Sequence, residues 1–107
     1  AVEPEDAFVA AISSCHMLWL LDLARRADFN VASYSDHAEG EMSRVAPGKM
    51  AITKVVLRPE ITLIGTEKPD QEWLTAIHEK AHDVCFIANS VKCEIAVEPE
   101  PVRLVAP

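Results

Sequence analysis

The sequence predicts an α+β domain in which a buried helix and a second helix pack on an antiparallel β-sheet, in the order α-β-β-α-β. A long apolar run opens the chain, and β-branched residues fill much of its middle. Apolar residues then return at helical spacing before a final alternating segment. At 107 residues the chain fits one domain, which we take to span residues 1–107.

The first helix is predicted from Pro4 to about Phe29. Pro4 suits the first helical turn, and the two acidic residues after it place negative charge near the positive end of the helix. No residue from 7 to 21 is charged, so the helix is apolar nearly all the way round and should be buried on every side. A chain of this size has little material to cover it, which favours an oligomer.

Two strands are predicted in the middle of the chain. Alternation indicates one from Asn30 to about Val45, and β-branched residues indicate another from Met50 to Ile64, with a break or bulge at Pro59. A Pro-Gly turn signal at residues 47–48 lies between them, so the two strands should form an antiparallel hairpin.

The second helix is predicted over about Asp70–Ala88, and Asn89 marks its end. A last strand follows from Val91 to about Val105. Its two prolines, Pro99 and Pro101, should end the regular pairing or mark a sheet edge, because proline cannot donate a ladder hydrogen bond.

Composition excludes several classes of function. The formal net charge of −7 and the absence of a basic stripe argue against binding to nucleic acid, which requires clustered Lys and Arg. The uncharged run is too short to span a bilayer, and no basic segment precedes it, so we expect neither a membrane partner nor a signal peptide. The odd number of cysteines excludes a full disulfide framework. We therefore expect a soluble cytoplasmic protein.

The cysteines are the first candidates for chemistry. Cys15 lies in the apolar helix among polar neighbours, and Cys85 lies near the end of the second helix, with His82 and His78 one and two turns before it. A thiolate is the reactive form of cysteine, and a nearby cation lowers the thiol pKa. Each cysteine also has an ordinary interpretation as a buried core residue, and we take Cys93 to be structural.

One short motif competes with the cysteines. His78-Glu79-x-x-His82 places two histidines four residues apart on a helix, where they can bind zinc with Glu79 as general base. The other histidines, His16 and His37, have no recognisable third-ligand spacing. A zinc hydrolase is therefore the less favoured alternative, and the ordinary interpretation is a solvated helix face. We expect no metal and no cofactor.

Several blocks of the sequence together resemble the OsmC/Ohr family, named for osmotically induced and organic hydroperoxide resistance proteins. The resemblance covers nearly the whole chain. It lies in Pro4-Glu5-Asp6, Ser13-Ser14-Cys15-His16, Ala38-Glu39-Gly40, Lys54-Val55-Val56-Leu57-Arg58-Pro59 and Ala81-His82-Asp83-Val84-Cys85-Phe86-Ile87-Ala88-Asn89-Ser90-Val91.

The resemblance implies an intertwined homodimer in which curved sheets wrap central helices. It implies that Cys15 is the peroxidatic cysteine, whose thiolate attacks an organic hydroperoxide and becomes a sulfenic acid. Cys85 would be the resolving cysteine, which condenses with that sulfenic acid to a disulfide. A dithiol reductant of the lipoyl type would then reduce the disulfide by exchange.

The resemblance also assigns supporting residues. Leu18, Trp19 and Phe86 would form apolar walls for the hydroperoxide. Glu5 matches the acidic residue that orients an activating arginine, although ten residues of straight helix span about 15 Å, so Glu5 would act only through a long arginine or across the dimer.

The chain differs from the family pattern at its start. It begins where the family's central helix begins, so the resemblance implies that the family's preceding β-rich segment is absent, either because the chain is a fragment or because that sheet is lost. No arginine in the sequence matches the activating position. The second hypothesis is therefore a catalytically impaired OsmC-like dimer that acts as a binding or structural module.

Overall fold

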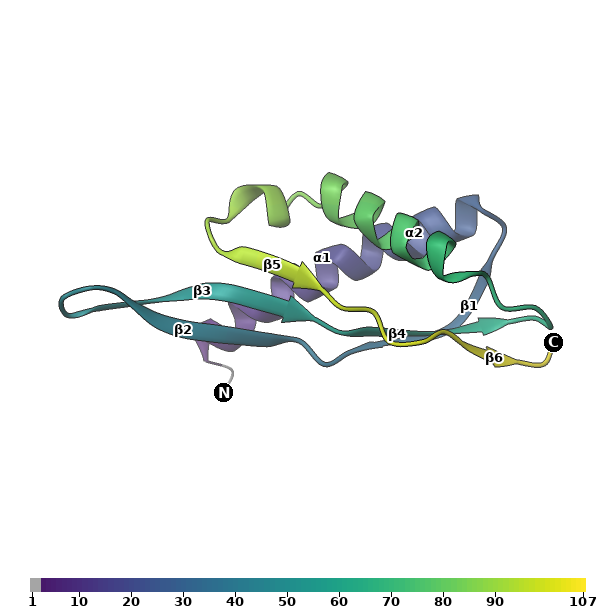
Figure 1. The fold of residues 1–107 in the computed structure, drawn as a ribbon, viewed down its shortest axis with the longest axis horizontal. Coiled ribbons are helices and arrows are strands. Elements are labelled where there is room, and N and C mark those ends of the chain that lie inside the picture. The colour runs from purple at the N-terminus through teal and green to yellow at the C-terminus, as the bar shows by residue number, and fades with distance from the viewer. Residues whose placement is uncertain (1–2) are drawn as a thin grey trace.

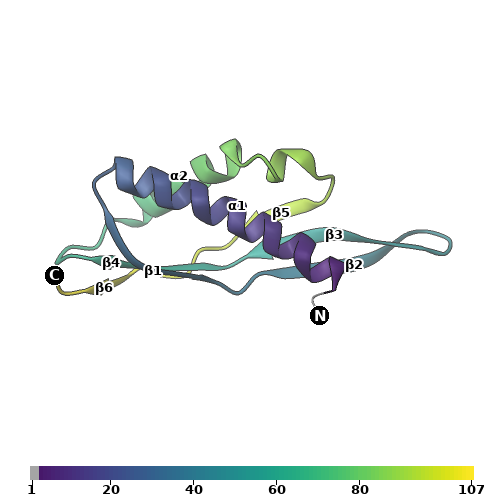
Figure 2. The same ribbon diagram turned by 180° about the vertical axis from the view of Figure 1, so that it is seen from behind.

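The structure is a computed structural model that describes residues 3–107 (Figure 1). Its elements, in chain order, are α1 (Pro4–Arg26), β1 (Asn30–Asp36), β2 (Glu39–Ala46), β3 (Lys49–Leu57), β4 (Pro59–Ile64), α2 (Gln71–Val84), the 3-10 turn η1 (Ala88–Ser90), β5 (Glu94–Val97) and β6 (Arg103–Val105). Both helices lie on one face of the strand layer, and the β2–β3 hairpin extends beyond them (Figures 1 and 2).

Helix α1 buries a single stripe within this chain. Its buried residues recur every fourth position, which places them on one face of a helix: Ile12, His16, Leu20 and Ala24. Leu18, on another face, is 63% exposed. The expectation of burial on every side is therefore wrong for the chain alone, because its own strands and α2 cover only one side of α1.

The length of α1 alters one argument made from the sequence. The uncharged run is short, but the whole helix has 23 residues and is long and apolar enough to cross a membrane by length and composition alone. Of its most apolar stretch of 18 residues, only 22% are buried within the chain. Core helices of folded domains pass the same criterion, and α1 packs on α2, β1, β2 and β3.

The two predicted middle strands pair antiparallel as expected, but each is divided in two. β1 pairs with β4, and β2 pairs with β3. The division lies where the Asp36 side chain accepts a hydrogen bond from the backbone N–H of Arg58 at 2.7 Å. The carboxylate thus takes a donor that a continuous ladder would have used. The break precedes Pro59, and Pro59 begins β4.

The predicted α+β class is confirmed, but the sheets are mixed rather than wholly antiparallel. The segment after α2 gives two strands, β5 parallel to β3 and β6 parallel to β4. Parallel neighbours require a crossover connection, and α2 provides it. The sheet orders are β1-β4-β6 and β2-β3-β5, and Pro99 and Pro101 lie between β5 and β6, where they end regular pairing as predicted.

Helix α2 is shorter than predicted. It begins after Asp70, whose side chain accepts a hydrogen bond from Trp73 N at 2.8 Å, and it ends at Val84 rather than at Ala88. Cys85 has an extended backbone. The Asn89 amide donates to the backbone oxygens of Asp83 and Cys85, so it binds carbonyl groups at the end of the helix, where such groups lack helical partners.

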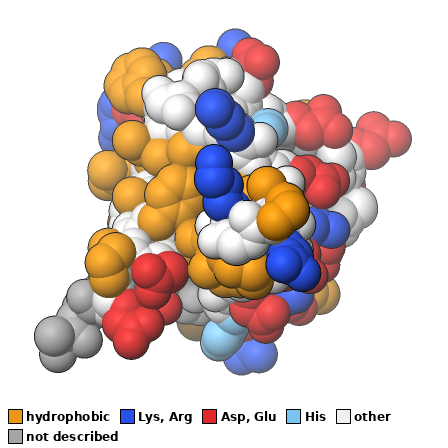
Figure 3. All heavy atoms as spheres, turned by 90° about the vertical axis from the view of Figure 1, so that its left-hand side faces the viewer, with side chains coloured by type: hydrophobic (Ala, Val, Ile, Leu, Met, Phe, Trp, Pro, Cys, Tyr) orange, Lys and Arg blue, Asp and Glu red, His pale blue; other side chains and the backbone are white. Residues whose placement is uncertain are grey.

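Two hydrophobic clusters form the core. The larger joins α1 and α2 to the first sheet, and the smaller joins the start of α1 to the second sheet. Large hydrophobic residues also stay exposed on the hairpin, namely Met42, Val45 and Met50. Viewed from the side on which the hairpin extends, hydrophobic side chains gather on the left flank, and acidic ones lie along the right flank and also at the lower left (Figure 3).

Gly40 sets how closely α1 approaches β2. A Cβ atom at Gly40 would lie 2.8 Å from the Cγ2 atom of Val9, which is closer than real Cβ contacts. We expect Gly40→Ala to lower the free energy of unfolding by about 1–3 kcal/mol, because the added methyl group overpacks this contact. Chemical denaturation measures the change.

Val9→Ala provides the matched test of this cause. Because it removes the opposing methyl group, the double variant should lose less stability than the sum of the two single variants. If the losses of stability in the two single variants add up to the loss in the double variant, the contact with Val9 is not what destabilises Gly40→Ala.

Candidate functional site

Two thiols meet where α1 packs against the end of α2. Cys15 is half-buried in α1, and Cys85, which directly follows α2, is 1% exposed. The side chain of Cys85 lies close enough to that of Cys15 for the two thiols to interact. Burial is the largest cause that raises the pKa of the Cys85 thiol, and the neighbouring Cys15 raises it further, while interactions with the backbone lower it. Cys85 is therefore held as a neutral thiol.

A pocket of about 290 Å³ opens beside Cys15. It is lined by Cys15, Leu18, Trp19, Asp22 and Phe86, so all three residues predicted as apolar walls line it together with the thiol. Trp19 and Phe86 meet edge to face, with ring centroids 5.5 Å apart. Phe86 is 70% exposed, so the apolar lining is open to a ligand.

Asp22 is a pocket residue that the sequence did not reveal. Its carboxylate accepts a hydrogen bond from Arg25 at 2.8 Å and forms an ion pair with Arg26 at 2.9 Å, so two guanidinium groups lie beside this pocket residue. The spacing of Asp22 from the two arginines, three and four residues along a helix, is the signal in the sequence for this ion-pair cluster.

Glu5 does not approach the thiols along its own helix. It is exposed in the first turn of α1, and α1 is one continuous helix through Cys15. Ten residues of helix separate the two by about 15 Å. Within residues 3–107, Glu5 therefore has no direct role at the thiol of the same chain.

A histidine pair joins the two helices next to the thiols. His16 Nε2 and His78 Nδ1 are 2.9 Å apart and share one hydrogen bond, and the rings lie parallel at an interplanar angle of 2°. Burial, helped by nearby His82, lowers the pKa of His16 to about 4, and Asp36 opposes that shift. Burial and His16 lower the pKa of His78 to about 3. Both rings are neutral at pH 7, so neither provides a cation for a thiolate.

Each ring of the pair has one nitrogen left over. His16 Nδ1 and His78 Nε2 are buried without a hydrogen-bond partner, and so is the hydroxyl of Tyr34. Burial raises the pKa of Tyr34, and the negative charge of Asp36 adds to this. The shared hydrogen bond is thus the only one that either imidazole makes within the described chain.

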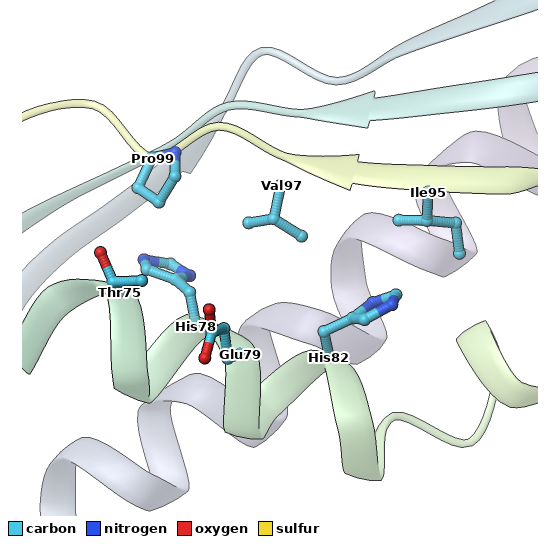
Figure 4. Close-up of a pocket in the computed structure, with 7 residues that line it drawn as sticks. All are labelled: Thr75, His78, Glu79, His82, Ile95, Val97 and Pro99. Carbon is cyan, nitrogen blue, oxygen red and sulfur yellow. The ribbon is translucent and has the colours of Figure 1, made fainter.

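The motif at residues 78–82 lines a second pocket, of about 300 Å³, between α2 and β5 (Figure 4). His78 and His82 extend from α2 toward the strand that carries Ile95 and Val97 (Figure 4). His78 is 3% exposed, so the interpretation as a solvated helix face is wrong for this residue. Among residues 3–107, no group of three or more His, Cys, Asp or Glu side chains is arranged to hold a metal ion.

Comparison with known proteins gives one family. The family described as OsmC-like protein matches residues 1–100. An OsmC-like protein of unknown function from Vibrio cholerae is 48% identical, with a TM-score of 0.87 over 92% of this chain. The chain spans 64% of the length of that protein.

More distant structures share the fold. An organic hydroperoxide resistance protein from Elizabethkingia anophelis is 23% identical, with a TM-score of 0.72, and the match covers 97% of this chain and 69% of that one. An organic hydroperoxide resistance protein from Legionella pneumophila is 21% identical, with a TM-score of 0.71, covering 96% of this chain and 70% of that one. No curated protein matches the chain.

The lowered pKa values of the histidine pair predict acid sensitivity. Between pH 6.5 and about 4, the unfolded chain takes up protons at His16 and His78 while the folded chain does not. The free energy of unfolding should therefore fall as the pH is lowered, by up to about 1.4 kcal/mol per pH unit for each histidine. Urea denaturation at a series of pH values measures the slope.

The variants His16→Gln and His37→Gln form the matched pair for this prediction. Replacing His16 removes one titrating ring and should flatten the slope, whereas exposed His37 should leave it unchanged. An equal slope in all three proteins would contradict the assignment of the acid sensitivity to the buried pair.

Proposed function

Because the chain belongs to the OsmC-like protein family, we propose that it is a thiol-dependent peroxidase that reduces organic hydroperoxides. The observation that carries the proposal is the contact between the Cys15 and Cys85 thiols beside an apolar pocket. Cys15 faces that pocket, and Cys85 is buried behind it. This arrangement suits one thiol for attack on a ligand and the other for the step that follows.

In the first step, the Cys15 thiolate attacks the terminal oxygen of the hydroperoxide. The O–O bond breaks, Cys15 becomes a sulfenic acid, and the alkoxide takes up a proton and leaves as an alcohol. Exposure favours Cys15 for this step, because it lines the pocket whereas Cys85 is 1% exposed. The raised pKa of Cys85 also keeps that thiol protonated and unreactive toward the peroxide.

In the second step, the sulfur of Cys85 attacks the sulfenic acid sulfur of Cys15. An S–S bond forms, and the sulfenic hydroxyl leaves as water with the proton from Cys85. A dithiol reductant, which we propose to be of the lipoyl type, then reduces the disulfide by two exchange steps and is itself oxidised to a cyclic disulfide. The proximity of the two thiols supports this pairing, because the resolving sulfur already lies beside the sulfur that is oxidised.

The pocket supports an organic rather than an inorganic peroxide as substrate. Leu18, Trp19 and Phe86 form an apolar lining, and burying such a surface against an alkyl or aryl group is favourable. Hydrogen peroxide has no such group and gains nothing from it.

We further propose that the protein works as a cytoplasmic homodimer without a metal or cofactor. OsmC-like proteins are typically homodimeric, and α1 leaves an apolar surface uncovered within the chain. A second protomer would cover apolar surface that the chain alone leaves exposed.

Cysteine variants test the catalytic assignment. Cys15→Ser should abolish hydroperoxide consumption, because it removes the attacking sulfur. Cys85→Ser should permit one oxidation of Cys15 and then stop turnover with a dithiol reductant, because no disulfide forms. Cys93→Ser is the control and should retain activity. If Cys15→Ser consumes hydroperoxide at the rate of the unaltered protein, the mechanism is wrong.

The alternative of a binding or structural module has its own outcome in this assay. A folded protein with all three cysteines that shows no turnover with any dithiol would support a catalytically impaired OsmC-like module.

The pocket lining is tested with two substrates. Phe86→Ser should raise the KM for cumene hydroperoxide about tenfold, because the variant loses roughly 1.5 kcal/mol of apolar contact with the aryl group. Its kcat/KM for hydrogen peroxide should stay unchanged. Met50→Ser, at another exposed apolar residue, which lies on the hairpin, is the control. Equal losses for both peroxides would assign Phe86 to folding instead.

A further inference from the structure

The histidine pair and the thiol pair join the same two helices at neighbouring positions of α1. His16 directly follows Cys15, and its partner His78 lies in α2, which ends just before Cys85. Among residues 3–107, the His16–His78 bond is the only side-chain hydrogen bond between α1 and α2 apart from the contact of the thiols. The bond is fully buried, since His16 is 1% and His78 is 3% exposed.

We propose that His16 and His78 are positioning residues that hold Cys15 in register with Cys85, so that the disulfide of the proposed peroxidase cycle forms efficiently. The proposal rests on that proposed function for its role in turnover. Neither histidine touches the reacting sulfurs in this scheme. They act through the orientation of α1.

Helix geometry gives the reason. Consecutive residues of a helix are about 100° apart around its axis and 1.5 Å apart along it. Contacts at both Cys15 and His16 therefore fix the rotation of α1 about its own axis as well as its position along α2. A slip of one residue would carry Cys15 away from Cys85.

A hydrogen bond fixes register better than apolar packing does. Apolar contacts between helices are not directional, so neighbouring registers differ little in free energy. Separating two buried imidazoles leaves a donor and an acceptor unpaired, which costs roughly 1–3 kcal/mol per group. The remaining ring nitrogens, His16 Nδ1 and His78 Nε2, have no hydrogen-bond partner. Neither ring therefore has a second hydrogen bond that would offset the loss of the first. Buried polar contacts set helix register in coiled coils in the same way.

The test is the equilibrium of the Cys15–Cys85 disulfide with dithiothreitol, measured in a Cys93→Ser background. Two cysteine thiols and one oxidised dithiothreitol give one protein disulfide and one reduced dithiothreitol, so two electrons are exchanged. Alkylation and mass measurement give the fraction of disulfide. No hydroperoxide is used, so the measurement reports how well the thiols are held together, independently of peroxidase activity.

Two double variants separate the hydrogen bond from packing. His16→Leu with His78→Met fills the space but forms no hydrogen bond, and it should lower the equilibrium constant about tenfold or more. His16→Gln with His78→Asn places amide groups at the Nε2 and Nδ1 positions and keeps the bond, and it should stay within about threefold of the histidine pair. Ser13→Ala removes a contact of α1 to Asp36 on β1 and should change nothing.

Near-ultraviolet circular dichroism of the Trp19–Phe86 pair reports whether each variant is folded. If the apolar pair does not fold, His16→Asn replaces it, because its amide ends short of the Nε2 position and breaks the bond with a smaller change. The proposal is overturned if folded variants without the histidine hydrogen bond have the same disulfide equilibrium constant as the protein with both histidines. It is equally overturned if the amide double variant lowers that constant as much as the apolar double variant does. It is also overturned if the unaltered histidine pair supports no Cys15–Cys85 disulfide. A normal disulfide equilibrium without hydroperoxide turnover would instead contradict the proposed function alone.

Discussion

The packing of α1 against α2 is the contact on which the candidate site depends. Cys15 and Cys85 are 70 positions apart in the sequence, and the contact between the two helices, here called the helix seam, brings their thiols together. The larger core cluster stabilises this contact, because Leu20 of α1 and Ala81 of α2 are both fully buried in it. Because apolar burial is favourable but not directional, the helix seam also needs polar contacts to set its register.

The buried side chains between α1 and α2 are neutral, whereas charged side chains lie at the edge of this contact. The histidines are neutral at pH 7 because burial lowers the pKa of both, and the Cys85 thiol is neutral because burial raises its pKa. Charged groups lie at the edge instead, where Asp22 holds Arg25 and Arg26. A buried contact with charged groups at its edge suits one thiol that lines a pocket and a second thiol that is protected from solvent.

Much of the fold was predictable from local patterns, whereas the contacts between distant segments were not. Pro4 and the apolar run predicted α1, and the Pro-Gly turn at residues 47–48 predicted the β2–β3 hairpin, because both signals are local. The parallel pairing of β5 and β6 and the break at Asp36 depend on partners far along the chain. The His16–His78 bond joins residues 62 positions apart, so no spacing rule could reveal it. The pairing of Cys15 with Cys85 was expected only from the family resemblance.

The central claim is that Cys15 and Cys85 form one redox pair. The most direct test is the mass of tryptic peptides after treatment with one equivalent of cumene hydroperoxide in the absence of reductant. Trypsin cleaves after Lys80 and Lys92, so Cys85 and Cys93 fall in different peptides. A peptide that links Cys15 to Cys85 is the predicted result. Free thiols, or Cys15 overoxidised alone, would contradict the claim and favour a binding module.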